Sequence, residues 1–482
     1  MTPDTLLLIA GLGVAAVVGL VLVDYVIRRA DVAAALLLGV IILQIGLPGL
    51  RLGVEIGAYV SALDAVGVIL VAAAIARLLR LNRVTVAQRL LALLGVLLVA
   101  SLVQGIGLWG LQTAVVEFRS FLAYFSAALY FATFHGPPES LDRIGRVILI
   151  AAVVLCGIVC FRWFGALTGF RPSLLRVEYG APIRVLDGPQ TFFLAQALFL
   201  VLPRWADGLA TPKQRWLAAG LATIVVLLNR RTAWLTVLVG VGILLWRRKG
   251  MGGRARPAMA VVAVIVTAVL LALPEADGSS DVAMSATDTG TLDWRLQGWT
   301  SLIVDNGPDG AGQWLLGIPM GSGYDREVLS SRDKVRTVES QPHSFHLQTM
   351  LRAGLLGFLA LTLLFAVALR QLRPGARRDD LTTGGKTPLV TREQLFVAVV
   401  MQVIWFATWQ VGLEQGLVTG LAAASWWHTR GEGGATASPG SNDIYQALTV
   451  VASGTRSSVE RSTLGPSKYA WEGSLGPSPA RI

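Results

Sequence analysis

Long runs of apolar residues, separated by short polar segments, recur along most of the 482-residue chain. A helix of about 20 apolar residues is long enough to cross the hydrocarbon core of a bilayer. The pattern therefore predicts an all-α polytopic membrane protein with about twelve transmembrane helices, or thirteen if a short last segment, 416–427, also crosses. The expected spans lie near residues 5–27, 31–50, 57–76, 86–108, 117–134, 144–165, 189–204, 216–229, 232–246, 258–274, 344–370 and 394–411.

One polar interruption is much longer than the others and divides the chain. Residues 1–274 are expected to form a helix bundle with short loops, 275–342 a separate loop domain, and 343–427 the C-terminal transmembrane helices. Residues 428–482 are rich in Gly, Ser, Thr and Pro, a composition typical of a disordered tail. We expect this tail to lie in the cytoplasm and its deletion to be tolerated.

The basic residues indicate the topology. A net charge of +11 could suit nucleic acid, but Lys and Arg concentrate in short loops such as 77–83, 247–257 and 371–392. Such loops face the cytoplasm in most membrane proteins. Loop 275–342 holds five basic and eleven acidic residues, which fits the exported side. We therefore expect no nucleic-acid partner. The first helix, which lacks a basic segment before it, is predicted to be retained.

Several arginines are expected at the exported face. Arg230 and Arg231 join two short apolar spans, and Arg184 and Arg295 lie in exported segments. An arginine below the headgroups is costly unless it meets a counter-charge or water. The side chains could snorkel to the interface, or they could form a cationic pocket, because guanidinium matches phosphate oxygens.

Residues 291–304 are predicted to form an amphipathic helix on the membrane surface. Trp294 and Trp299 favour the interface, and Arg295 is expected at the polar edge. The same pattern would also suit an ordinary lid helix with a solvated arginine.

His343 and His346 stand at the start of the 344–370 span. We expect His343 near a helix N-cap and His346 on the same face. Three roles are open: a structural histidine, a zinc pair, or a general base acting on a sugar hydroxyl. No Cys or His elsewhere in the exported loops completes a zinc site. Cys156 and Cys160 lie inside one apolar helix and suggest no disulfide. No metal and no cofactor is expected.

The order of these motifs resembles that found in the bacterial O-antigen ligase / O-antigen polymerase superfamily. Members of this superfamily are multi-span glycosyltransferases. The matching features are an arginine turn between two helices, a loop opening with Arg-x-x-x-Trp, a Gly-x-Gly turn, and a histidine motif that runs into a Gly-Leu-Leu-Gly helix. They correspond here to Arg231, to Arg295 and Trp299, to Gly321-Ser322-Gly323, and to 343–348 followed by 354–357. The chain departs from the family in having Ser344 where Asn is usual and Arg230 in place of a small residue. The second departure leaves open whether Arg230 or Arg231 is the key arginine.

The resemblance implies transfer of a glycan from an undecaprenyl-pyrophosphate-linked donor to an acceptor sugar hydroxyl, with inversion and without a metal. The site would lie on the periplasmic side of the bacterial inner membrane, among membrane lipids. His343, Arg295 and Arg231 would be catalytic, and Arg184, Arg230, His346 and Trp299 would bind substrate. Ligase and polymerase activities stay open. The alternative from another class is a transporter or flippase for lipid-linked glycans.

Overall fold

The computed structural model divides the chain into two compact units, Met1–Gly431 and Glu432–Ile482. The description below covers residues 18–50, 52–56, 58–81, 83–135, 138–170, 185–228, 230–247, 290–329, 335–339, 341–373 and 389–424. The second unit, the predicted tail and the predicted span 258–274 lie outside these residues, as does Arg184.

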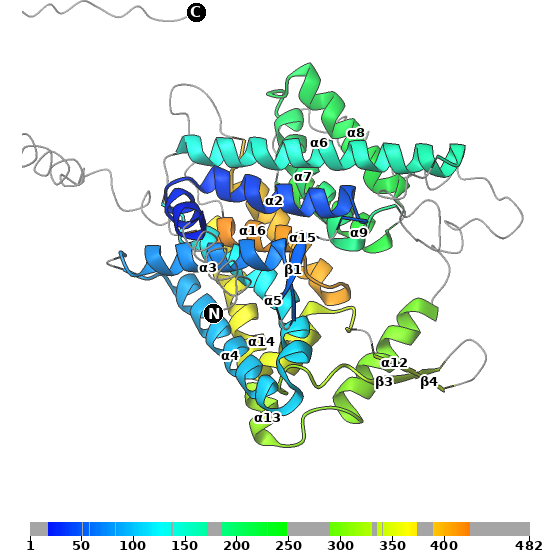
Figure 1. Ribbon diagram of the computed structural model, residues 1–482. Coiled ribbons are helices and arrows are strands. Elements are labelled where there is room, and N and C mark those ends of the chain that lie inside the picture. The colour runs from blue at the N-terminus through cyan, green and yellow to red at the C-terminus, as the bar shows by residue number, and fades with distance from the viewer. Residues whose placement is uncertain are drawn as a thin grey trace, which may run out of the picture. The chain divides into compact units, whose positions relative to one another are not determined.

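The N-terminal half of the described chain is a set of helices interrupted by one hairpin (Figure 1). Residues 18–28 are helical, and α2 lies alongside the long helix α6. The elements that follow residues 18–28 are α2 (Ala30–Gly46), β1 (Gly53–Ile56), β2 (Ala58–Ser61), α3 (Ala62–Leu78), α4 (Val86–Trp109), α5 (Leu111–Ala132) and α6 (Pro138–Thr168).

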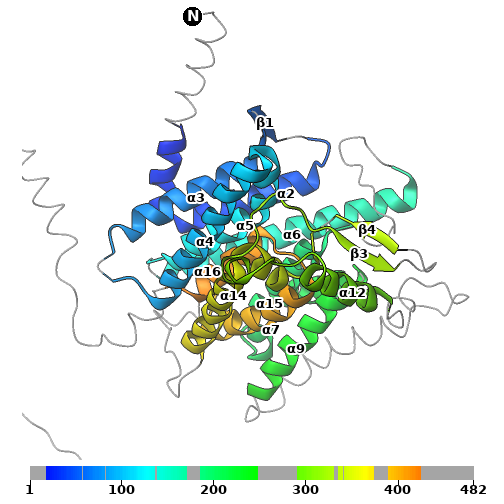
Figure 2. The ribbon, with the colours of Figure 1, turned by 90° about the horizontal axis from the view of Figure 1, so that it is seen from below.

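The C-terminal half carries the second group of helices and the described part of the predicted exported loop. Its elements are α7 (Gly188–Ala206), α8 (Pro212–Leu227), α9 (Arg231–Arg247), α12 (Gly290–Val304), α13 (Ala311–Leu316), β3 (Arg326–Leu329), β4 (Val335–Val338), α14 (Phe345–Leu372), α15 (Arg392–Thr408) and α16 (Leu413–Ala422). Seen from below, α7, α15 and α14 follow one another, with α12 and the β3–β4 hairpin beside them (Figure 2).

Capping boxes set the start of several helices. Thr85, Thr211 and Thr391 each accept a hydrogen bond from the backbone N–H of a glutamine three residues later, and the glutamine side chain accepts one in return. This reciprocal pairing satisfies two N–H groups that the helix itself leaves unbonded.

Helix α5 lies at the centre of the packing, with α3, α4 and α16 against it. The Tyr124 hydroxyl of α5 donates to Thr419 Oγ1 of α16 at 2.9 Å. Gly416 and Gly420 of α16 face the α5 backbone, where a Cβ atom would collide with the carbonyl oxygens of Tyr124 and Ala128. The two glycines therefore allow these helices to approach closely.

Four described helices are long and apolar enough to cross a membrane: α4, α5, α14 and residues Glu139–Thr168 of α6. The structure thus supports an all-α membrane protein. It does not establish the count of twelve, because other described helices are shorter; α2, α3, α9 and α15 have 17 residues each. The predicted span 57–76 also differs, since its first residues form strand β2 and α3 begins only at Ala62.

Helix α14 contains a kink at Gly354, which has φ +66° and ψ −170°. A Cβ atom at this position would collide with the carbonyl group of Leu315 in α13. Next to the kink, the Ile318 N–H donates to the Leu351 carbonyl at 2.6 Å. Glycine is needed here both for the positive φ and for the close approach of α13.

Candidate functional site

His343 lies immediately before α14, held by contacts on both sides. Ser344 is the N-cap of the helix, and its hydroxyl accepts from the Leu347 N–H at 3.3 Å. The Phe345 N–H donates to the carbonyl of Trp409 at 3.0 Å, which ties the start of α14 to the end of α15. These two hydrogen bonds fix the backbone next to His343 and so help to set the position of its imidazole.

Trp409 is the aromatic residue around which the site is arranged. Its indole stacks on Trp405, with ring centroids 5.3 Å apart, and its Nε1–H donates to Thr232 Oγ1 at 3.1 Å. The His343 ring centroid lies 5.6 Å away. Gly188 borders the same indole, and a Cβ there would come within 2.6 Å of the ring.

Two guanidinium groups lie over the Trp409 ring. The Cζ of Arg230 is 5.4 Å from the ring centroid and that of Arg295 is 5.5 Å. Arg230 also donates to the Leu186 carbonyl at 2.9 Å. Cations over an indole face are stabilised by the ring quadrupole. Trp409 thereby holds two positive charges that come from segments far apart in the sequence.

A second tryptophan brings a third cation to the site. The Trp294 ring lies 6.1 Å from that of His343, and the Cζ of Arg326 is 5.3 Å from the Trp294 ring centroid. Arg326 is 2% exposed. We call Arg230, Arg295, Arg326, His343, Trp294 and Trp409 the arginine–tryptophan cluster.

The electrostatics of the cluster keep His343 neutral. Burial, followed by the charges of Arg295, Arg326 and Arg230, lowers the pKa of His343 from 6.5 to about 4. Burial and the charge of Arg231 lower the pKa of Arg295, and burial lowers that of Arg326. Within the described residues, Nδ1 of His343 and Nε of Arg295 are buried without a hydrogen-bond partner. The cluster therefore combines a neutral imidazole with several positive charges.

The Gly321–Gly323 turn is held by a different pair of residues. Glu117 of α5 and Arg352 of α14 form a buried ion pair, and Glu117 Oε2 accepts from the Gly321 N–H at 2.5 Å. Arg352 donates to Ser322 Oγ at 2.7 Å and also to the Gly323 carbonyl. The turn is thus fixed to two helices by charge-assisted hydrogen bonds.

The structure brings together only some of the predicted site residues. Arg230, Arg295 and His343 belong to the cluster, while Arg231 is exposed at the first position of α9 and acts on Arg295 through its charge. Trp299 packs instead against a small core formed by Leu302, Tyr324, Leu347 and Leu351.

His346 has different surroundings from His343. Its Nε2 is 3.3 Å from the Val403 carbonyl, and its ring meets those of Phe358, Phe365 and Phe406 edge-on. The expectation that both histidines share one helical face is wrong, because His343 precedes the N-cap Ser344.

Sequence patterns missed Trp409, Arg326, Glu117 and Arg352. Trp409, a tryptophan at the end of an apolar helix, carries the interface signal that could have drawn attention to it. Glu117 and Arg352 are charges inside apolar segments, which are costly in a membrane and therefore usually paired or functional. Both were visible as exceptions in the apolar pattern.

No group of three or more His, Cys, Asp or Glu side chains that could hold a metal occurs in the described part of the chain. The chain matches no model of a known protein family and no curated protein.

Proposed function

We propose that this protein transfers a glycan from a polyprenyl-pyrophosphate donor, of the undecaprenyl type, to an acceptor hydroxyl at the exported face of the bacterial inner membrane. The observation that supports this most is the neutral imidazole of His343 beside three guanidinium groups. Such a site combines a proton acceptor with a region of positive charge suited to a pyrophosphate.

His343 would act as the general base. Its unprotonated nitrogen takes the proton of the acceptor hydroxyl while the hydroxyl oxygen bonds to the anomeric carbon of the donor. The bond from that carbon to the phosphate oxygen breaks, and its electron pair leaves with the pyrophosphate. Attack from the face opposite the leaving group inverts the anomeric carbon.

The arginines would stabilise the leaving group. Negative charge grows on the pyrophosphate as the glycosidic bond breaks, and Arg230 and Arg295, together with Arg231 at the edge, can meet this charge with guanidinium N–H groups. Their positive charge can serve the purpose for which other enzymes use a metal ion. Trp409 would keep two of these guanidinium groups in place before the donor arrives.

Donor binding and base strength are linked in this arrangement. The charges of Arg295, Arg326 and Arg230 contribute to the low pKa of His343. A bound pyrophosphate offsets those charges, so the pKa of His343 rises and the imidazole becomes a stronger base when the donor is present. The base is therefore most effective in the complex in which it is needed.

The test is glycan transfer by purified protein in detergent, with EDTA, comparing wild type with His343→Ala. If His343 is the base, the substitution lowers the rate by about 10²–10⁴-fold. Because a neutral imidazole contributes no charge, the same variant should still bind the pyrophosphate donor. Arg295→Gln should instead weaken donor binding, whereas Arg89→Gln, which removes an exposed arginine of α4, should not.

Each outcome has a clear meaning. Equal transfer by wild type and His343→Ala would refute the assigned base, with His346→Ala the next variant to measure. Donor movement across a vesicle membrane without product would favour a transporter of lipid-linked glycans. Where transfer occurs, a single addition indicates a ligase, and a ladder of products indicates a polymerase.

A further inference from the structure

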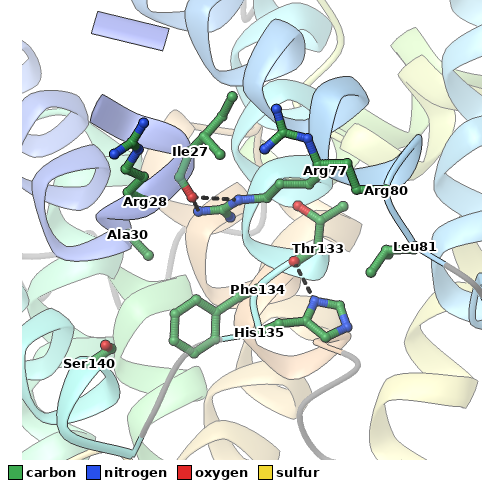
Figure 3. Close-up of a pocket in the computed structure, with 10 residues that line it drawn as sticks. All are labelled: Ile27, Arg28, Ala30, Arg77, Arg80, Leu81, Thr133, Phe134, His135 and Ser140. Carbon is green, nitrogen blue, oxygen red and sulfur yellow. Dashed lines mark hydrogen bonds between the residues drawn. The ribbon is translucent and has the colours of Figure 1, made fainter. Parts of the chain in front are cut away.

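A pocket of about 290 Å³ lies among the ends of five helical segments (Figure 3). Its wall includes Arg28 before α2, Arg77 in the last turn of α3, Thr133 at the end of α5 and Ser140 near the start of α6. Thr133 and Ala30 are buried, whereas Arg28 and Arg80 are exposed. The pocket therefore has a closed floor and a basic rim.

The pocket is separate from the arginine–tryptophan cluster and from the Gly321–Gly323 turn. Glu117, which holds that turn, and Thr133, which lines the pocket, are sixteen residues apart along α5. A helix rises about 1.5 Å per residue, so the two lie roughly 24 Å apart along its axis. Arg77, Arg80 and Leu81 of its wall belong to segment 77–83, which the charge pattern assigns to the cytoplasm.

The charge of the pocket wall has one sign. Of the described residues, three arginines and His135 line it, and none of those that line it is Asp or Glu. The ion pair that Arg28 makes with Asp24, at 3.0 Å, is exposed on both sides and is therefore weak. Positive charge here is available to a ligand that enters the pocket.

Arg77 is held in place by the protein. Its guanidinium donates to the Val26 carbonyl at 3.2 Å, the Ile27 carbonyl and the Tyr130 hydroxyl at 3.0 Å, and it lies 4.4 Å from the Tyr130 ring centroid. Its Nη1 is buried without a hydrogen-bond partner among the described residues. A guanidinium fixed in this way keeps its positive charge at the pocket wall.

We propose that this pocket binds a phosphate group, either that of an anionic lipid headgroup or free phosphate. Guanidinium forks match phosphate oxygens, and basic pockets between helices on the cytoplasmic side bind anionic headgroups. The preference of basic residues for cytoplasmic loops accounts for the presence of these positive charges. It does not explain why they surround a pocket with a fixed arginine and, among its described lining residues, no carboxylate.

The test is native mass spectrometry of the purified full chain, with phosphatidylglycerol or phosphatidylcholine added to the detergent. The variants are Arg28→Gln, Arg80→Gln and the double variant, none of which touches the internal bonds of Arg77. Arg83→Gln is the matched control, since Arg83 is exposed in the same loop as Arg80 but does not line the pocket. A second series adds inorganic phosphate as competitor.

We expect the wild type and Arg83→Gln to retain phosphatidylglycerol in preference to phosphatidylcholine. Each pocket arginine removed should weaken that retention by about fivefold. Competition by millimolar phosphate would identify the free anion as a ligand, and retention that phosphate does not disturb would identify the lipid headgroup. The proposal is overturned if Arg80→Gln and Arg83→Gln bind both phosphatidylglycerol and inorganic phosphate alike.

Discussion

His343 is neutral because two influences act on it in the same direction. It is buried, and the nearest charges that act on it are cations. Both disfavour the imidazolium form. In the proposed mechanism, a base with a pKa near 4 is available at neutral pH but intrinsically weak, so we expect its strength in the donor complex to set the rate.

The pH dependence of transfer should show whether the pKa of His343 differs between the free protein and the donor complex. Activity is lost as the pH falls, because a protonated imidazole accepts no proton. We expect the acidic limb of kcat/KM, which reports the free enzyme, near the His343 pKa of about 4. The acidic limb of kcat, which reports the donor complex, should lie at a higher pH. In Arg295→Gln, the limb of kcat/KM should move up towards 6.5, the ordinary value for histidine.

These profiles can contradict the assignment. Limbs of kcat and kcat/KM that coincide near pH 6.5 in both proteins would mean that the arginines do not act on the base. Nuclear magnetic resonance of labelled histidine gives a second measurement, since the His343 signal should titrate below the range usual for the residue.

Trp409 should be needed for its ring more than for its N–H group. Trp409→Leu removes the surface over which Arg230 and Arg295 lie, and we expect donor affinity to fall by roughly fivefold, for about 1 kcal/mol of cation–π interaction. Trp409→Phe loses the hydrogen bond to Thr232 but keeps a smaller aromatic ring for the guanidinium groups, so its effect should be smaller. Trp216→Leu, at an exposed tryptophan of α8, is the control. Equal affinity in Trp409→Leu and the control would refute this role.

At the scale of elements, the predicted exported loop is attached to the helix bundle through backbone contacts. Gly105 of α4 faces Met320, whose N–H donates to the Ser101 carbonyl at 3.2 Å. The Glu117–Arg352 pair then holds the turn that follows. The position of the loop thus depends on how closely α4 allows residues 318–321 to approach.

Gly105→Ala should displace this segment. A Cβ atom at Gly105 would collide with the Met320 carbonyl, whereas one at Gly107, on the same helix, meets nothing within 4 Å. We expect Gly105→Ala to lower Tm and glycan transfer, and Gly107→Ala to leave both unchanged. The two variants add the same single methyl group, so equal behaviour would show that the contact does not matter.

At the scale of the whole molecule, hydrophobic runs located some helix starts closely and others, those of α5 and α6, only to within six residues. The starts expected for α7, α9 and α14 were 189, 232 and 344, and the helices begin at Gly188, Arg231 and Phe345. The β1–β2 hairpin was missed because its apolar residues continue directly into those of α3. Apolarity alone does not separate a short strand from the start of a helix.

The site residues that were missed contact residues that are distant in the sequence. Arg295 and Trp409 are more than one hundred residues apart, and only the folded chain brings the two side chains together. A local sequence pattern cannot show that these two side chains meet. His343 and Arg295 were singled out from their positions beside apolar spans and from the order of the motifs, whereas neither signal pointed to Trp409.

The orientation of the chain in the membrane can be tested with cysteine labelling. In a Cys156→Ser/Cys160→Ser background, we expect Asp309→Cys to react with a membrane-impermeant maleimide in intact cells and Arg83→Cys to react only after the cells are opened. Both positions are exposed in the structure, so access depends on the side of the membrane. The reverse pattern would place the arginine–tryptophan cluster on the cytoplasmic side.

The ion pair between Glu117 and Arg352 has a consequence for biosynthesis. The two residues are 235 positions apart, so the ribosome completes α5 long before it makes the cation that neutralises Glu117. Until α14 is inserted, the nascent chain carries this carboxylate in an apolar helix without its final partner, and the Gly321–Gly323 turn has only one of its two supports. Synthesis arrested between these points should leave a product that cellular quality control recognises and degrades.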